Sequence, residues 1–182
     1  MKKFELTSEF VTFLGKTLFR IKALVSFGDV AKGELGGFIE REDNLDQSGD
    51  AWVCGNAKVF GNARVSGNAW VCGNARVYGD AKVFGNAQVF GNARVCGDAR
   101  VFGDAWVQNC RDYSATSCFG SENRTTTFFR TKDGGISVRC GCFYGTLREF
   151  REKVKERHGD SRLAKEYLML ADLMEFRLSK DE

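Results

Sequence analysis

Residues 49–108 follow a strict six-residue pattern of small, polar and apolar positions. Ten consecutive hexads have the form Gly-(Asn/Asp)-Ala-x-Val-x, and none is interrupted. The alternation Ala-x-Val places alanine and valine on one side of a short strand and the residue between them on the other. Glycine followed by Asn or Asp tolerates a positive φ angle, so the chain can turn a corner every six residues. The pattern therefore predicts short strands joined by regular corners and wound into a coil.

This segment resembles the hexapeptide-repeat, left-handed β-helix superfamily, whose motif is an aliphatic residue with a small residue four positions later. Val53 and every sixth residue to Val107 match the aliphatic position, and the alanines from Ala57 to Ala105 match the small one. The Gly-Asn variant is similar to hexapeptide-repeat proteins of phages and prophages. The resemblance implies three hexads per triangular coil, with residues 18 apart stacked directly. It also extends the coil back to about Val30, so we assign residues 31–108 to a left-handed parallel β-helix.

In that register the outward residues form three columns, each on one face of the coil. The columns are Trp52, Trp70, Gln88 and Trp106; Lys58, Arg76 and Arg94; and Arg64, Lys82 and Arg100. The first holds every tryptophan of the chain, and an exposed column of indoles is typical of an interface. We expect the C-terminal helices or a second copy of the chain to cover it. A surface for stacking bases or a small ligand is the alternative.

The two basic columns stack like charges. Cations about 4.8 Å apart repel by roughly 1 kcal/mol in water. Asp80 and Asp98 precede Lys82 and Arg100 and offset part of this repulsion, whereas asparagines precede the cations of the Lys58 column. The Lys58 column is therefore expected to be the less compensated of the two. Either column is a solvated polar face or a strip that binds phosphates, nucleic acid or an acidic protein surface.

The segments that flank the repeats predict two end structures. Residues 1–30 alternate apolar and polar side chains around a turn at Leu14-Gly15, which indicates a β-hairpin that covers the first coil. Residues 109–182 indicate a small α+β unit, with a loop to residue 124, strands at 125–131 and 136–140, and two helices capped by Thr146 and Ser161. The second helix has a predicted core face of Leu163, Tyr167, Leu170, Met174 and Phe176. We expect this unit to dock on the solenoid at the Trp column.

Composition bears on the partners, the cellular location and the state of the cysteines. The 182 residues are 43% hydrophobic and 28% charged, with a net charge of +3, which is too mild to indicate nucleic-acid binding by itself. Because no long apolar run or signal peptide is present, we expect a cytoplasmic protein with no membrane contact. The seven cysteines are then expected to be reduced thiols. Cys54 and Cys72, one coil apart, are interpreted as small packing residues.

Candidate chemistry is limited by a single histidine, His158. Hexapeptide-repeat acyltransferases use a histidine beside the coil, and the related γ-type carbonic anhydrases bind zinc through three, so neither activity fits. A four-thiolate zinc site of Cys110, Cys118, Cys140 and Cys142 stays open, although C-x-C is a short spacing. We expect no catalytic residue, no metal and no cofactor.

The sequence as a whole favours a non-enzymatic binding protein. The resemblance implies a phage-type, homo-oligomeric protein (a dimer or trimer) that presents a rigid surface to a host or viral protein and inhibits a host defence. The first alternative is binding of an anion, a nucleotide or nucleic acid through the basic columns. The second is a hexapeptide-type acyltransferase that works without a catalytic histidine.

Overall fold

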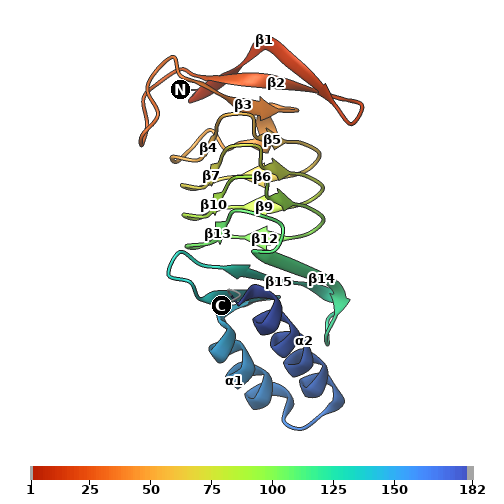
Figure 1. The fold of residues 1–182 in the computed structure, drawn as a ribbon. Helices are drawn as coiled ribbons and strands as arrows, with labels where there is room; N and C mark the ends of the chain where they lie inside the picture. The colour runs from red at the N-terminus through yellow and green to blue at the C-terminus, as the bar shows by residue number, and fades with distance from the viewer. Residues whose placement is uncertain (1, 180–182) are drawn as a thin grey trace.

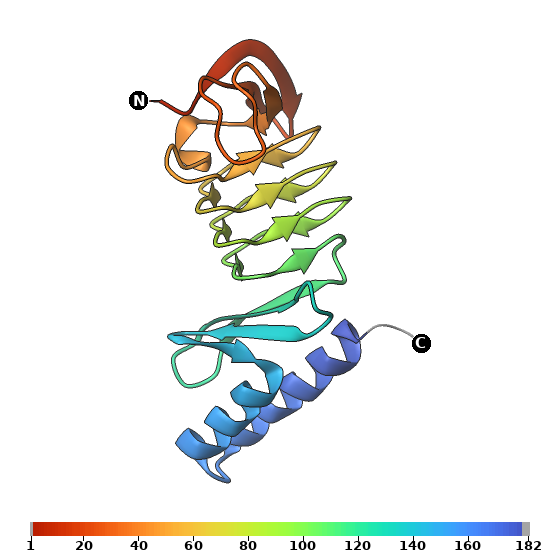
Figure 2. The same ribbon diagram turned by 90° about the vertical axis from the view of Figure 1, so that its left-hand side faces the viewer.

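A computed structural model describes residues 2–179 and shows an elongated, mainly β protein. An N-terminal hairpin lies at one end of a parallel β-solenoid, and a C-terminal sheet with two helices lies at the other (Figure 1). The view from the side shows the coils stacked one upon another between these two structures (Figure 2). In the part of the chain that the structure describes, neither helix is long and apolar enough to cross a membrane.

The solenoid repeats a two-residue strand at every hexad. These strands are Trp52–Val53 (β4), Lys58–Val59 (β5), Arg64–Val65 (β6), Trp70–Val71 (β7), Arg76–Val77 (β8), Lys82–Val83 (β9), Gln88–Val89 (β10), Arg94–Val95 (β11), Arg100–Val101 (β12) and Trp106–Val107 (β13). They pair in parallel with the strand 18 residues away, which gives three sheets, one on each face. The alanines and valines point inward and are almost fully buried. The predicted triangular register is confirmed, with alanine and valine together on the buried side.

Glycine at the corners is required by both conformation and space. All ten repeat glycines have positive φ angles, from +61° at Gly91 to +73° at Gly79. A Cβ atom on Gly85 would lie 2.9 Å from the backbone nitrogen of Gly103 in the next coil. Real Cβ atoms do not come that close to backbone, so successive coils can stack at strand spacing only because the corners carry no side chain.

The predicted N-terminal hairpin is formed by Phe4–Phe13 (β1) and Lys16–Ala23 (β2). Its turn uses positive φ angles at Leu14 and Gly15. β2 pairs antiparallel with Leu35–Ile39 (β3), and β3 pairs in parallel with β5 of the solenoid. One face of the solenoid therefore extends into the hairpin as a single sheet with the order β1-β2-β3-β5-β8-β11.

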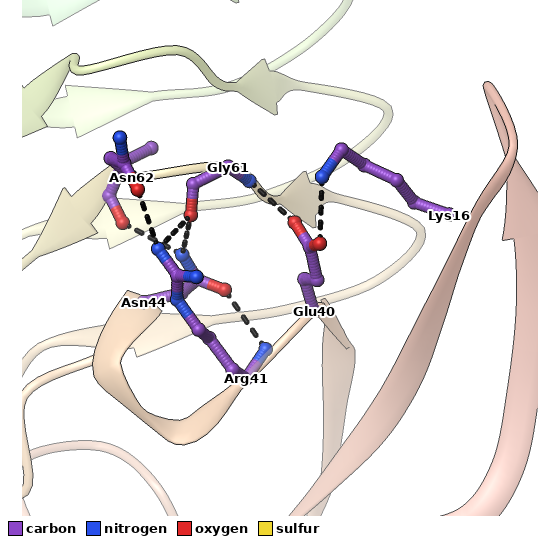
Figure 3. A network of polar contacts seen from close by, with 7 residues as sticks. Lys16, Glu40, Arg41, Asn44, Gly61 and Asn62 are labelled. Atoms are coloured by element: carbon purple, nitrogen blue, oxygen red, sulfur yellow. Dashed lines mark hydrogen bonds and ion pairs between the residues drawn. The ribbon is translucent and has the colours of Figure 1, made fainter.

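A second face of the first coil is closed mainly by side chains, together with one parallel bridge between Leu45 and Val65 in which the Asp46 amide donates to Val65 O at 2.9 Å. The 3-10 helix Glu42–Asn44 (η1) lies where a preceding hexad would stand. The Asn44 amide donates to the carbonyls of Gly61 and Ala63 at 3.0 and 2.9 Å, and Arg41 donates to Gly61 O at 2.8 Å and to Asn62 Oδ1 at 2.7 Å (Figure 3). These donors replace the amides that a preceding coil would supply.

The third face is closed by a buried lysine. The Nζ atom of Lys3 donates to the carbonyls of Ser48, Gly49 and Ala51, and the residue is 4% exposed. Burial lowers the pKa of Lys3, while the nearby carboxylates of Asp46 and Asp50 act in the opposite direction.

The C-terminal unit contains more strands than the sequence predicts. Its sheet has the order β14-β15-β16-β17, formed by Tyr113–Phe119 (β14), Arg124–Arg130 (β15), Ile136–Cys140 (β16) and Phe143–Thr146 (β17). The prediction of a loop up to residue 124 is wrong. The Ser- and Thr-rich segment of β14 resembles a loop by composition, but antiparallel pairing with β15 over Tyr113↔Phe129 to Phe119↔Arg124 makes it a strand.

This sheet lies across the end of the solenoid and not on the Trp column, so the predicted docking position is wrong. β15 contacts β12 and β13, and Ala105 forms an antiparallel bridge with Thr131. Phe129 packs into the solenoid core, whereas its neighbour Phe128 points to the other side and packs among the helices. The sheet therefore separates the solenoid core from the helical core.

The helices are Leu147–His158 (α1) and Arg162–Leu178 (α2). The predicted caps are confirmed, because Thr146 and Glu149 form a capping box and the Ser161 hydroxyl accepts from the amide of Ala164. The predicted core face of α2 is correct at Tyr167, Leu170 and Met174 but wrong at Phe176, which is 84% exposed. Phe176 extends an exposed stripe with Met169 and Leu173, one helical turn apart, because the sheet contacts only the opposite side of α2.

Candidate functional site: a basic strip on one solenoid face

Each predicted column of outward residues occupies a single sheet. Trp52, Trp70, Gln88 and Trp106 are direct neighbours in β4-β7-β10-β13. Lys58, Arg76 and Arg94 are neighbours in β5-β8-β11, and Arg64, Lys82 and Arg100 are neighbours in β6-β9-β12. Residues 18 apart also stack at the corners, where the ring centroids of Phe60 and Tyr78 are 5.1 Å apart and those of Phe84 and Phe102 are 4.6 Å apart. The faces differ in what covers them.

The Trp column is partly covered by the chain's own N-terminal segment. Trp52 is fully buried, with the ring of Phe27 packed edge-on at 5.4 Å. Trp70, Gln88 and Trp106 are half-buried, and Trp106 packs edge-on against Phe90 at 4.7 Å. The expectation that the C-terminal helices cover this column is wrong, because those helices lie on their own sheet beyond the end of the solenoid. Little indole surface is left as a flat platform for stacking.

The Lys58 column lies beneath the hairpin. The tip residue Phe13 lies over both cations, 5.6 Å from Lys58 Nζ and 4.6 Å from Arg76 Cζ, and Phe38 lies 5.5 Å from Lys58 Nζ. Burial lowers the pKa of Lys58, and the charge of Arg76 lowers it further. Cation–π contacts thus occupy two of the three cations, and of this column only Arg94 is exposed.

The Arg64 column is open to solvent along its whole length. Arg64, Lys82 and Arg100 are all exposed, and within residues 2–179 none of them forms an ion pair. They share a shallow cleft of about 650 Å³, whose N-terminal end is lined by Glu42, Asp43 and Asp46. Of these carboxylates, Glu42 is paired with Lys2 at 2.8 Å.

The positive face continues beyond the solenoid. Arg100 also lines a second hollow, of about 360 Å³, together with Asp98 and with Arg124 and Arg139 of the C-terminal sheet. Arg139 stacks over Phe102, 5.5 Å from the ring centroid, which fixes its position beside the last coil. We call Arg64, Lys82, Arg100 and Arg124 the basic strip.

This geometry changes the ranking of the two basic columns. The sequence favoured the Lys58 column because aspartates precede Lys82 and Arg100. In the structure, however, the Asp80 carboxylate accepts from the Asn62 amide at 3.0 Å, and no ion pair joins Asp80 or Asp98 to the cations within the described residues. No sequence signal showed that the hairpin tip would cover the other column, or that Arg124 would extend this one.

The cysteines fall into two groups. Cys54 and Cys72 form a disulfide between adjacent coils, with Cα atoms 4.7 Å apart, so the expectation of free packing thiols is wrong for this pair. Equivalent positions 18 residues apart are stacked at a distance that suits a disulfide. The other five cysteines are free: Cys96, and the four considered as a zinc site, Cys110, Cys118, Cys140 and Cys142. Across residues 2–179, no three potential ligands come together as a metal site, and these four thiols are not brought together.

The single histidine lies far from the solenoid. His158 ends α1, and its half-buried ring stacks on Tyr167 with centroids 5.7 Å apart. None of the residues 49–108 of the coils is a histidine. The faces of the coil therefore offer cations, amides and aromatic rings, which are groups for binding.

The solenoid matches a known repeat. The model of a family described as YdcK beta solenoid repeat matches residues 57–73 and 93–109, both of which lie within the coils. A search of curated proteins found no match to this chain. The matched segments and the stacked parallel coils agree, and the chain is a β-solenoid repeat protein.

Proposed function

We propose that this is a non-enzymatic binding protein that presents the basic strip to an acidic segment of a partner protein. The observation that carries the proposal is the register of Arg64, Lys82 and Arg100, which are exposed and without ion pairs within the described residues. The coil fixes the backbone positions of these three residues, so the backbone loses little conformational entropy when a partner binds.

The spacing of the strip suits a protein partner. Adjacent cations are separated by one coil, about 4.8 Å, close to the 5–6 Å between side chains one turn apart on a helix. An acidic helix with carboxylates at such positions can therefore pair with successive cations. Asp98 and the carboxylates at the N-terminal end of the cleft make this face mixed in charge, which disfavours a uniform polyanion.

The finer identity rests on the repeat itself. The unbroken hexads support a hexapeptide-type solenoid of the kind that resembles phage proteins. On that resemblance alone we propose a host or viral protein as the partner, inhibition of a host defence as the effect and the cytoplasm as the location; the Cys54–Cys72 disulfide is more typical of an oxidising compartment. The exposed stripe of Met169, Leu173 and Phe176 on α2 supports a homo-oligomer, since identical apolar stripes can pack about a two-fold axis.

The test is fluorescence anisotropy with a labelled helical peptide that carries glutamates at every third or fourth position. The wild-type protein is expected to bind it, and Lys82→Glu/Arg100→Glu to weaken binding about tenfold or more, equivalent to about 1.4 kcal/mol. The single variants Arg100→Glu and Arg94→Glu make the same change in net charge, and Arg94 is an exposed cation on another face, so Arg94→Glu is the matched control for Arg100→Glu and is expected to change the affinity little.

Two outcomes would contradict the proposal. Equal binding by the wild type and the double variant would remove the basic strip from the site. Tighter binding to a DNA or RNA oligonucleotide than to the peptide, with a steep loss of affinity between about 50 and 200 mM salt, would favour nucleic acid instead.

A further inference from the structure

The C-terminal unit contains a pocket that shares only Arg124 with the basic strip. It has a volume of about 620 Å³ and lies between the ends of β14 and β16, the start of β17 and the two helices. Such a volume fits a small organic molecule.

The floor of the pocket is aromatic and held in place. Phe150 contacts both Phe143 and Tyr167, with ring centroids 5.6 and 5.9 Å apart, and Phe119 packs edge-on against Tyr167 at 5.7 Å. These four rings all line the pocket. Mutual edge contacts fix the rings, so an apolar ligand meets a surface that is already formed.

The rim of the pocket is cationic. The cations Arg124, Lys153 and Arg157 line it together with the imidazole of His158, against the single carboxylate of Glu122. Lys153 is engaged by Glu156 at 2.9 Å, and Arg124 lies 3.8 Å from Glu122. Within residues 2–179, Arg157 has no ion-pair partner. A guanidinium beside an apolar floor provides a position for one acidic group.

A hydroxyl lies at the wall of the same pocket. Tyr167 Oη accepts a hydrogen bond from the Ser121 amide at 3.1 Å, and no acceptor for its own proton is found in the described part of the chain. A Cβ atom on Gly120 would collide with this hydroxyl, so the glycine is what allows Tyr167 to reach the wall. Tyr167 can therefore donate to a bound oxygen.

We propose that this pocket binds a small amphipathic anion, which consists of an apolar body and one carboxylate. The body lies on the rings of Phe143, Phe150 and Tyr167, and the carboxylate accepts from Arg157 and the Tyr167 hydroxyl. The proposal concerns the C-terminal unit alone and stands or falls independently of the basic strip.

The test uses the thiol of Cys142, which is exposed and lines the pocket, while Cys110 is exposed outside it. The protein is treated with iodoacetamide in the presence of decanoate, of 2-naphthoate or of the neutral 2-naphthalenemethanol. Mass spectrometry then measures the rate at which each cysteine is alkylated. At ten times its dissociation constant, a bound carboxylate is expected to slow alkylation of Cys142 about tenfold and to leave Cys110 unchanged.

The two carboxylates distinguish an aliphatic from an aromatic body, and protection by either one supports the proposal. No selective protection of Cys142 by either would overturn it. Equal protection by the neutral alcohol would overturn the anion requirement. Arg157→Glu is expected to weaken protection about tenfold, whereas Lys155→Glu, the same charge change two residues away and outside the pocket, is not.

Discussion

The two ends of the solenoid are closed by opposite chemistry. Within the coils, an amide of each turn donates to a carbonyl of the following turn, as in Arg64 N to Ala81 O and Arg76 N to Ala93 O. The first turn therefore has carbonyls without partners, and the last turn has amides without partners. At the N-terminal end the chain supplies donors, from the Lys3 ammonium, the Asn44 amide and the amides of β3 and its flanks.

At the C-terminal end the chain supplies acceptors. Thr127 Oγ1 accepts from the amide of Arg100 at 3.1 Å, and Tyr113 Oη accepts from that of Cys96 at 3.3 Å. The Asp112 carboxylate accepts from the amide of Gln108 at 2.9 Å and also from that of Asn109. A parallel solenoid has a direction along its axis, and each cap carries the hydrogen-bonding groups that its own end lacks.

The largest expected effect is at the acceptor end. Asp112 is 4% exposed, accepts two amides and lies 3.3 Å from Arg130. Asp112→Ala leaves the amides of Gln108 and Asn109 without their acceptor and removes the ion pair with the half-buried Arg130, which keeps its hydrogen bonds to Leu178 O and Ser179 O. It is expected to lower the free energy of unfolding by about 3 kcal/mol. Urea denaturation measures this. Asp98→Ala, at an exposed corner, is the control and should cost little; equal losses in both would contradict the cap assignment.

At the N-terminal end of the solenoid, stability is expected to fall when a side-chain donor is replaced by an acceptor. Asn44→Ala is expected to cost about 2 kcal/mol, because the buried Ala63 carbonyl loses its donor and Gly61 O keeps only the hydrogen bond from Arg41. Asn44→Asp keeps the shape but offers only acceptors to Gly61 O and Ala63 O, so it should cost more than Ala in the same denaturation experiment. If Asp were tolerated better than Ala, the end would not be short of donors.

The smallest expected effect comes from Glu40, an acceptor at the donor end. Its carboxylate accepts from Lys16 Nζ at 2.7 Å and from the Gly61 amide at 2.6 Å (Figure 3). The hydrogen bond from Lys16, with a smaller one from Gly61, holds the pKa of Glu40 below 4.5. The stabilisation, about 1 kcal/mol, is present above pH 4.5 and is lost as pH falls through the lowered pKa.

Glu40→Gln removes this titration. Wild type is therefore expected to lose more stability than Glu40→Gln when the pH is lowered from neutral to below the pKa of Glu40, and the two proteins should converge at the acid limit. Thermal unfolding at a series of pH values measures the difference. Parallel curves for the two proteins would show that Glu40 adds no pH-dependent stability.

What could be predicted from the sequence was what local repetition determines. Identical residues every six positions determine the register of the coils. The strand neighbours of Trp70 and Lys82 were therefore predicted correctly from the sequence. The helix caps at Thr146 and Ser161 were also local. Contacts between distant segments were not accessible in this way, because no periodicity shows that Phe13 would cover Arg76. The position of the C-terminal sheet was missed for the same reason, and with it the extension of the basic strip to Arg124.

The three-sided coil also couples length to orientation. Insertion or loss of three hexads would lengthen or shorten the solenoid by one coil. The C-terminal unit would then keep its orientation relative to the N-terminal hairpin. A single added hexad would instead swing the whole distal module through a third of a revolution, and Arg124 would no longer continue the row begun by Arg64. The length of the solenoid can therefore change only in steps of 18 residues if the cations of the coils and Arg124 are to stay on one face and contact the same partner.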